Sequence, residues 1–309
     1  YEELRAQVEG MTRSLGQVVQ KKDVTTDEDV CAFLQVPVPP WKGRCGELRW
    51  MNLLNLVLVG WAVYLRRQEI HNLRMCDLSW DESSVSVWVQ NTKNDKRGEG
   101  RESKLCAGEG LNGGPQLMQL LKEGLLQVHG SLERHPRCIK KEDPAKRCDR
   151  CRPVIPSITT EKMHDRPIPK SSIAPLMKEG YRWLEECGRS KPGRVTKISV
   201  SSLRRGGNTM AAAEGIRQTV RAKHGRWKRE ATVTEYDGLA PGEDGEVTRA
   251  LQRRLARAWS AGMAQGVGAK RADERPRRES GAANAKRQRR GGKRPRCVVG
   301  LERGWVSAT

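Results

Sequence analysis

The sequence lacks an apolar run long enough to cross a membrane. The one candidate, Trp50 to Leu65, is shorter than the roughly 20 residues that a spanning helix needs, and it carries Asn52 and Asn55. We therefore interpret it as a buried core helix and expect no membrane partner. Internal repeats of solenoid period are also missing, which argues against the stacked-repeat architectures.

A secretory or transit signal is not evident either, and the chain begins at Tyr1 without a Met. We expect that an upstream segment is lost. Without a secretory signal, the nine cysteines are expected to be reduced thiols. Paired cysteine spacings therefore indicate metal ligands before they indicate disulfides.

Acidic residues are too few to balance the basic ones. The chain has 58 Lys and Arg against 37 Asp and Glu, a formal charge of +21, which favours a polyanion as partner. Residues 267–309 hold thirteen basic and four acidic residues, so 13 − 4 gives +9 of that charge. This stretch, with the run Lys286 to Arg296, has little apolar surface and is predicted to be a disordered tail. It serves as a nuclear import signal or a clamp on DNA phosphates, or it is only a solvated tail.

The length and the 36% hydrophobic content indicate one main core with extensions. We predict an N-terminal helical segment at 1–46 and a main domain at 47–245. An insertion at about 129–166, rich in Cys, Lys, Arg and Pro, interrupts that domain. A helix at 246–266 and the tail at 267–309 complete the chain.

Hydrophobic periodicity predicts a mainly helical α+β fold with one small antiparallel sheet. Alternating valines indicate a strand at 84–90, and a second strand is expected to return at about 102–106. Helices are predicted at 47–65, 115–128, 172–187 and 201–215. Ser172 is expected to cap the third of these helices, with Gly188 and Gly215 as stops.

Several residue clusters, in fixed order, could cut a phosphodiester. Arg66 and Glu69 are three apart on one helix face, and arginine forks match two phosphate oxygens at once, so Arg66 and Arg204 are the candidate clamp. Lys93, after the first strand, could donate a proton to the leaving oxygen. Tyr236 would attack and form a covalent intermediate that keeps the bond energy for rejoining. This chemistry needs no metal or other cofactor.

The sequence resembles the tyrosine recombinases of the phage-integrase family. LRRQEIHNLRMCDL is similar to the first-arginine motif, with Arg66 in the arginine place, and SSLRRGGNTMAAAEGI to the second, with Arg204. HGRWKREATVTEYDG resembles the third, with Trp227 where the family has His or Trp and Tyr236 nine residues later. The resemblance covers about residues 47–239. Lys93 falls where the family has its hairpin lysine.

The resemblance implies a site-specific recombinase or integrase, encoded by a mobile element, that acts on double-stranded DNA as a homo-tetramer. It also implies a nuclear location in a eukaryotic host and a cytoplasmic or nucleoid one otherwise. The helix at 246–266 would dock onto a neighbouring subunit, or it packs on its own domain. Residues 1–46 are too short for the family's complete N-terminal DNA-binding domain and would be its remnant.

One departure from the family concerns proton transfer. Ser201 stands where the second motif normally has His, and a hydroxyl is a poorer acid or base near neutral pH. His224 could compensate or could be structural. Two alternatives therefore stay open: a DNA-binding protein whose catalytic site has decayed, and a type IB-like topoisomerase that relaxes DNA with the same tyrosine chemistry.

The insertion carries a second candidate site. His135, Cys138, Cys148 and Cys151 form two paired halves, a spacing typical of a structural zinc site. His129 and His164 are spare ligand candidates. The alternative is a flexible basic insert with unpaired thiols.

Overall fold

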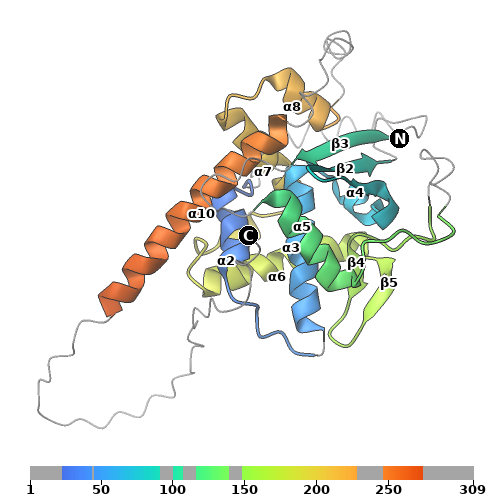
Figure 1. The fold of residues 1–309 in the computed structure, drawn as a ribbon. Helices are drawn as coiled ribbons and strands as arrows, with labels where there is room; N and C mark the ends of the chain where they lie inside the picture. The colour runs from blue at the N-terminus through green and yellow to red at the C-terminus, as the bar shows by residue number, and fades with distance from the viewer. Residues whose placement is uncertain are drawn as a thin grey trace, which may run out of the picture.

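A computed structural model describes residues 23–43, 45–90, 100–106, 116–138, 148–227 and 246–273, with side chains in the last range through residue 261. Within these ranges the fold is mixed α and β, with helices around a central helix and small antiparallel sheets (Figure 1). The predicted α+β class is therefore confirmed. The elements are α2 (Asp27–Gln35), α3 (Gly46–Ala62), α4 (Arg67–Asn72), η1 (Met75–Asp77), β1 (Leu78–Trp80), β2 (Ser84–Val89), β3 (Arg101–Cys106), α5 (Leu117–His129), β4 (Pro156–Ile158), β5 (Met163–Pro167), α6 (Lys170–Glu186), η4 (Arg194–Thr196), α7 (Val200–Ala213), α8 (Gln218–His224) and α10 (Glu246–Asp273).

Helix α3 is the centre of the core. It is apolar around nearly its whole circumference, a pattern that only a helix covered on every side can carry, and Trp50, Leu53 and Trp61 are fully buried. Helices α5, α6 and α7 pack against it. Asn52 donates to the carbonyl of Pro156 at 2.9 Å, which satisfies its amide nitrogen inside the core. The apolar run is thus a core helix, as predicted.

The main sheet has the order β1-β2-β3 and is antiparallel throughout. In β2, Val85, Val87 and Val89 point into the core, so the alternation in the sequence is the alternation of the two sheet faces. Both predicted strands are confirmed. The short β1 was not predicted, nor was a second sheet, β4 with β5, that lies within the insertion.

The predicted helices form with small shifts at their ends. The Ser172 cap is wrong: α6 begins at Lys170, and Ser172 is inside its first turn, where its backbone N–H donates to Pro169 at 2.8 Å. Pro169 is the N-cap residue instead. Gly188 and Gly215 both adopt positive φ after their helices, as the stop signals predict.

The described parts of the two chain ends pack on each other. Helix α2 contributes Val30 and Phe33 to the main core and packs along α10, where Arg254 pairs with Asp27 at 3.0 Å. Leu251 and Leu255 of α10 are fully buried, so this helix packs on its own domain. It runs to Asp273, seven residues into the predicted tail. The rest of the tail and residues 1–22 lie outside the described residues.

Candidate phosphodiester site and cysteine centre

The first part of the site is built where α3 turns into α4. Tyr64 has a positive φ of 55° and lies between the two helices. Arg66, two residues later, is the N-cap residue of α4. Glu69, one turn into that helix, accepts a hydrogen bond from the backbone N–H of Arg66 at 2.8 Å and from its Nη1 at 3.1 Å. One carboxylate therefore fixes both the backbone and the guanidinium of Arg66. The Arg66 side chain keeps 27% of its surface exposed, so a ligand can reach it.

Arg204 comes to the same carboxylate from α7. Its Nη1 lies 3.9 Å from a Glu69 oxygen and donates to the carbonyl of Tyr64 at 2.7 Å, and its Nη2 donates to the carbonyl of Gly225. The guanidinium stacks on the Trp227 ring, 4.5 Å from its centroid. These contacts hold Arg204 rigidly beside Arg66.

Arg226 is a third arginine in this cluster, and the sequence patterns did not indicate it. It has a positive φ of 57° and a side chain only 1% exposed. Its guanidinium donates to Glu69 at 3.1 Å, to the carbonyl of Val63 at 3.1 Å and to Ser103 Oγ at 2.9 Å. It therefore joins the third motif to the first-arginine segment and to β3.

The electrostatics of the cluster favour an anion. Within the described residues, ion pairs join three guanidiniums, those of Arg66, Arg204 and Arg226, to the single carboxylate of Glu69. Burial, followed by repulsion from Arg66 and Arg226, lowers the pKa of Arg204 to about 9. A bound phosphate would relieve that repulsion and accept charge-assisted hydrogen bonds. The partly exposed Arg66 marks the side from which it could enter.

The other predicted residues lie around this cluster. Trp227 is half-buried under Arg204, and His224 is buried, with its ring edge-on to Tyr64 and its Nε2 2.8 Å from the carbonyl of Ala62. That contact gives His224 a structural hydrogen bond to α3. Ser201 lies on α7, exposed, with its Oγ 2.8 Å from Ser199 Oγ. Ser201 lies in the first turn of α7, the helix that also carries Arg204.

Two predicted catalytic residues, Lys93 and Tyr236, lie outside the described residues. Their flanking elements are described: Lys93 falls between the paired ends of β2 and β3, and Tyr236 falls between Trp227 and the start of α10. Strand β3 contacts the site directly, because Ser103 accepts from Arg226 and donates to the backbone carbonyl of His224. Strand β3 is therefore anchored beside the arginines.

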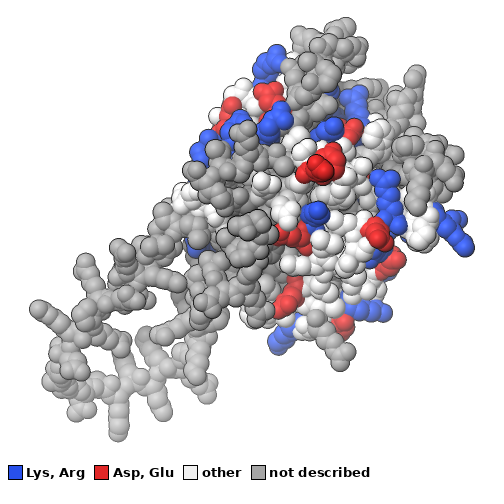
Figure 2. Space-filling model, viewed as in Figure 1, with Lys and Arg blue, Asp and Glu red and all other residues white. Residues whose placement is uncertain are grey.

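Charged side chains are mixed over the face that Figure 2 shows. Lys and Arg are interspersed with Asp and Glu in the described part of that face.

The insertion brings together a different set of residues from the one predicted. Cys138, Cys148 and Cys151 meet Cys76, which follows α4, and the four sulfur atoms all lie within 4.8 Å of one another. His135 is not in this group: its side chain is exposed and its Nδ1 accepts from the backbone N–H of Arg137 at 3.1 Å. The predicted ligand His135 is therefore wrong, and Cys76 is the fourth residue of the group. All four cysteines are buried, and burial raises the pKa of Cys151 to about 11.

The spare histidines are also outside the cysteine group. His129 is buried at the end of α5 with its Nε2 3.2 Å from the carbonyl of Val154, and His164 lies on β5. A buried group of four cysteines that could hold a structural metal is therefore present in the described residues, without a histidine.

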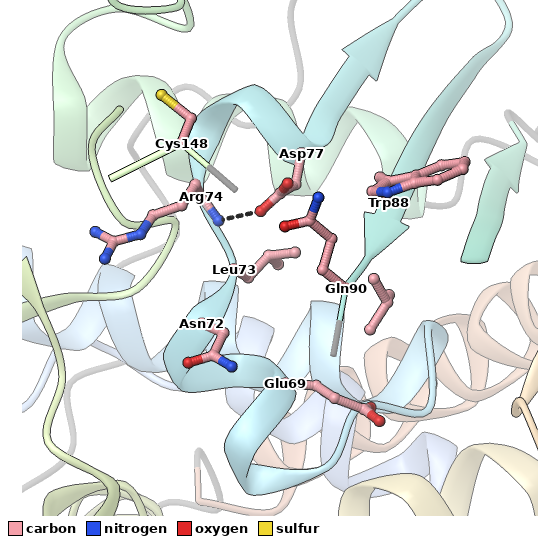
Figure 3. A pocket seen from close by; sticks show the side chains of 9 residues that line it. Glu69, Asn72, Leu73, Arg74, Asp77, Trp88, Gln90 and Cys148 are labelled. Atoms are coloured by element: carbon pink, nitrogen blue, oxygen red, sulfur yellow. Dashed lines mark hydrogen bonds between the residues drawn. The ribbon is translucent and has the colours of Figure 1, made fainter. Parts of the chain in front are cut away.

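A small pocket lies between one residue of the arginine cluster and one residue of the cysteine group (Figure 3). On one side lies Glu69 of the arginine cluster, and on the other lies Cys148 of the cysteine group. Between them, the backbone N–H of Arg74 donates to Asp77 at 2.7 Å. The lining residues are Glu69, Asn72, Leu73, Arg74, Asp77, Trp88, Val89, Gln90 and Cys148.

Comparison with protein-family models gives no match for this chain, and comparison with curated proteins gives none. Within the described ranges, none of the helices combines the length and the apolar character needed to cross a membrane.

Proposed function

We propose that this protein is a DNA recombinase or integrase that cleaves and rejoins DNA strands through a tyrosine. The observation that carries the proposal is the convergence of Arg66 and Arg204 on Glu69. Two arginines from segments 138 positions apart (204 − 66) meet at one carboxylate, with the Trp227 ring behind them. This is the order and type of residues that the resemblance to tyrosine recombinases requires.

In the proposed reaction, the scissile phosphate lies between Arg66 and Arg204, which bind its non-bridging oxygens. The hydroxyl oxygen of Tyr236 attacks the phosphorus and loses its proton to a solvent water molecule, and the bond from phosphorus to the 5′ oxygen breaks. Lys93 gives a proton to the leaving 5′ oxygen, and a 3′-phosphotyrosine remains. Attack by a 5′ hydroxyl reverses these steps and reseals a strand. Negative charge gathers on the non-bridging oxygens during each step, where preorganised donors stabilise it most.

The remaining residues position this machinery. Glu69 orients Arg66 through two hydrogen bonds, and Arg226 holds Glu69 in turn. Double-stranded DNA is the proposed substrate, and two-site strand exchange requires a homo-tetramer. A structural zinc ion at the cysteine group is also part of the proposal.

The exposed Ser201 favours a second candidate, a DNA-binding protein that has lost catalysis. Its hydroxyl forms a hydrogen bond with the hydroxyl of Ser199. A serine hydroxyl is a weaker proton donor to a phosphate than the usual histidine. Such a protein would bind DNA with the same affinity after Tyr236→Phe and would never relax or exchange strands.

A supercoil relaxation assay and a two-site exchange assay, run side by side on the full chain and on Tyr236→Phe, test the proposal. Exchange products that vanish in the variant support a recombinase. Relaxation without exchange on any paired substrate would indicate a topoisomerase instead. Intact DNA with both proteins, together with equal DNA binding, would favour the binding protein.

A further inference from the structure

The four sulfurs of the cysteine group have the spacing of a metal centre. Cys76, Cys138, Cys148 and Cys151 are each at most 4% exposed, and their sulfurs lie within 4.8 Å of one another. A tetrahedral zinc ion with bonds of about 2.3 Å to sulfur places its sulfurs about 3.8 Å apart. Small side-chain rotations suffice to reach that geometry. We infer that these four cysteines bind one zinc ion as thiolates, and that the ion joins the insertion to the segment that carries Arg66 and Glu69.

The backbone explains how two distant segments supply the ligands. Residues beside Cys76 and Cys151 pair as a short antiparallel bridge between Arg74 and Pro153. Met75 donates to Arg152 at 2.9 Å, and Val154 donates to Leu73 at 2.9 Å. This bridge places Cys76 opposite the Cys148-x2-Cys151 pair. Cys138 closes a turn, because its own backbone N–H donates to the carbonyl of His135 at 2.9 Å.

Hydrophobic packing alone does not explain why four cysteines are buried here. They form an apolar cluster of their own, separate from the main core in the described residues. None of these four cysteines forms a disulfide in the structure. Four buried thiols in a cluster of their own, three of them from an insert rich in charged residues, are typical of structural zinc centres, where the metal contributes the folding energy.

Charge also fits a tetrathiolate. Four thiolates and one divalent cation leave a net charge of −2, and basic side chains surround the centre in the sequence. Arg74 lies two residues from Cys76, with its guanidinium 3.7 Å from Asp149, and its Nε is buried without a hydrogen-bond partner. Arg152 follows Cys151 directly and donates to the carbonyl of His129 at 2.7 Å. A soft, tetrahedral set of four sulfurs selects zinc over the oxygen-preferring cations.

The position of Cys76 gives the centre a consequence for the rest of the molecule. Cys76 lies in η1, seven residues after Glu69 (76 − 69), and Cys148 lines the same pocket as Glu69 (Figure 3). Asp77, the residue after Cys76, lines this pocket as well. The ion therefore joins two of the segments that line it. That it steadies a catalytic arginine rests on the proposed function, whereas metal binding itself does not.

Metal content of the full chain, purified under reducing conditions, tests the inference without any DNA assay. Wild type is expected to carry one zinc per chain. His135→Ala and Cys106→Ser, a half-buried cysteine outside the group, should keep it. Cys76→Ser should bind zinc at least about 100-fold more weakly in competition with a chromophoric chelator, more than loss of an outer-shell contact costs. Zinc lost in His135→Ala but kept in Cys76→Ser would overturn the ligand set.

Two further measurements keep the inference testable if Cys76→Ser does not fold. Cobalt added to the metal-free wild type should give the visible absorption of a tetrahedral tetrathiolate. Hydrogen exchange should show that residues 66–77 lose protection when zinc is removed by a chelator and regain it when zinc is returned. Wild type with no bound zinc, with iron in its place, or with two disulfides under reducing conditions would refute the centre. Intact metal binding with no DNA cleavage would refute only the proposed function.

Discussion

Replacing Glu69 by glutamine removes the one negative charge that the arginine cluster shares. The side chain is 1% exposed and bonds to Arg66 and to Arg226, each at 3.1 Å, with Arg204 at 3.9 Å. Glutamine keeps the size and one carbonyl oxygen, so the cavity stays filled. Its amide group, however, carries no charge and turns a donor toward guanidiniums that only donate.

The magnitude follows from how deeply each partner is buried. Breaking a buried ion pair by removing one member costs about 3–5 kcal/mol, because the other charge stays buried without compensation. Arg226, at 1% exposure, meets that condition fully, and Arg204, at 8%, nearly so. Arg66 is 27% exposed and its pair with Glu69 contributes less, because water screens it. We therefore expect Glu69→Gln to lower the free energy of unfolding by about 3–5 kcal/mol, a large part of a typical total of about 5–15 kcal/mol.

Urea unfolding with an unchanged slope would measure this loss. Glu82→Gln, at an exposed position between β1 and β2, is the matched control and should change stability by less than about 0.5 kcal/mol. Arg226→Met should cost less in the Glu69→Gln background than in wild type, because the two residues are in contact. A loss below about 1 kcal/mol for Glu69→Gln, or strict additivity, would refute the view that this carboxylate holds the cluster together.

Two further predictions concern pH and DNA. Burial lowers the pKa of His129, so the folded state prefers the neutral ring; stability should be complete above the unfolded pKa of about 6.5 and should fall as pH drops through the folded pKa. In His129→Gln, the urea concentration at the unfolding midpoint should depend less on pH over this range. An equally steep dependence in the variant would exclude His129 as the cause. Arg66→Ala and Arg204→Ala should each slow DNA cleavage at least about 100-fold while DNA affinity, which should fall steeply with salt, changes less than about tenfold. Parallel losses of binding and cleavage would contradict that division.

Elements with long periodic patterns were predictable from the sequence, and short elements were not. The alternating valines of β2 and the apolar run of α3 carry strong patterns over their whole length. By contrast, α4 has six residues and β1 has three, too few for a period to show. The position of α4 depends on tertiary contacts such as the one between Glu69 and Arg226.

The site was partly predictable for a similar reason. The sequence could predict that four residues come together, because each lies in a recognisable motif: Arg66, Glu69, Arg204 and Trp227. Arg226 was missed because one arginine among 58 basic residues carries no pattern of its own.

The cysteine group shows the limit of spacing arguments. Cys148 and Cys151 carry a clear paired spacing, but Cys76 lies 62 positions before Cys138 (138 − 76), and only the bridge between Arg74 and Pro153 brings it near. His135 matched the spacing and yet faces away, because a turn directs its ring to the backbone of Arg137. A lone cysteine after a helix offers no sequence signal that it belongs to a distant pair.

The most direct test of the account is covalent trapping on nicked suicide substrates drawn from a pool of random duplexes. Wild type and Tyr236→Phe would be compared on a denaturing gel. The account predicts a protein–DNA adduct with the wild type, linked through a 3′ phosphate to Tyr236, and none with the variant. A folded wild-type protein that binds these duplexes without forming any adduct, or an adduct that persists in Tyr236→Phe, would contradict it.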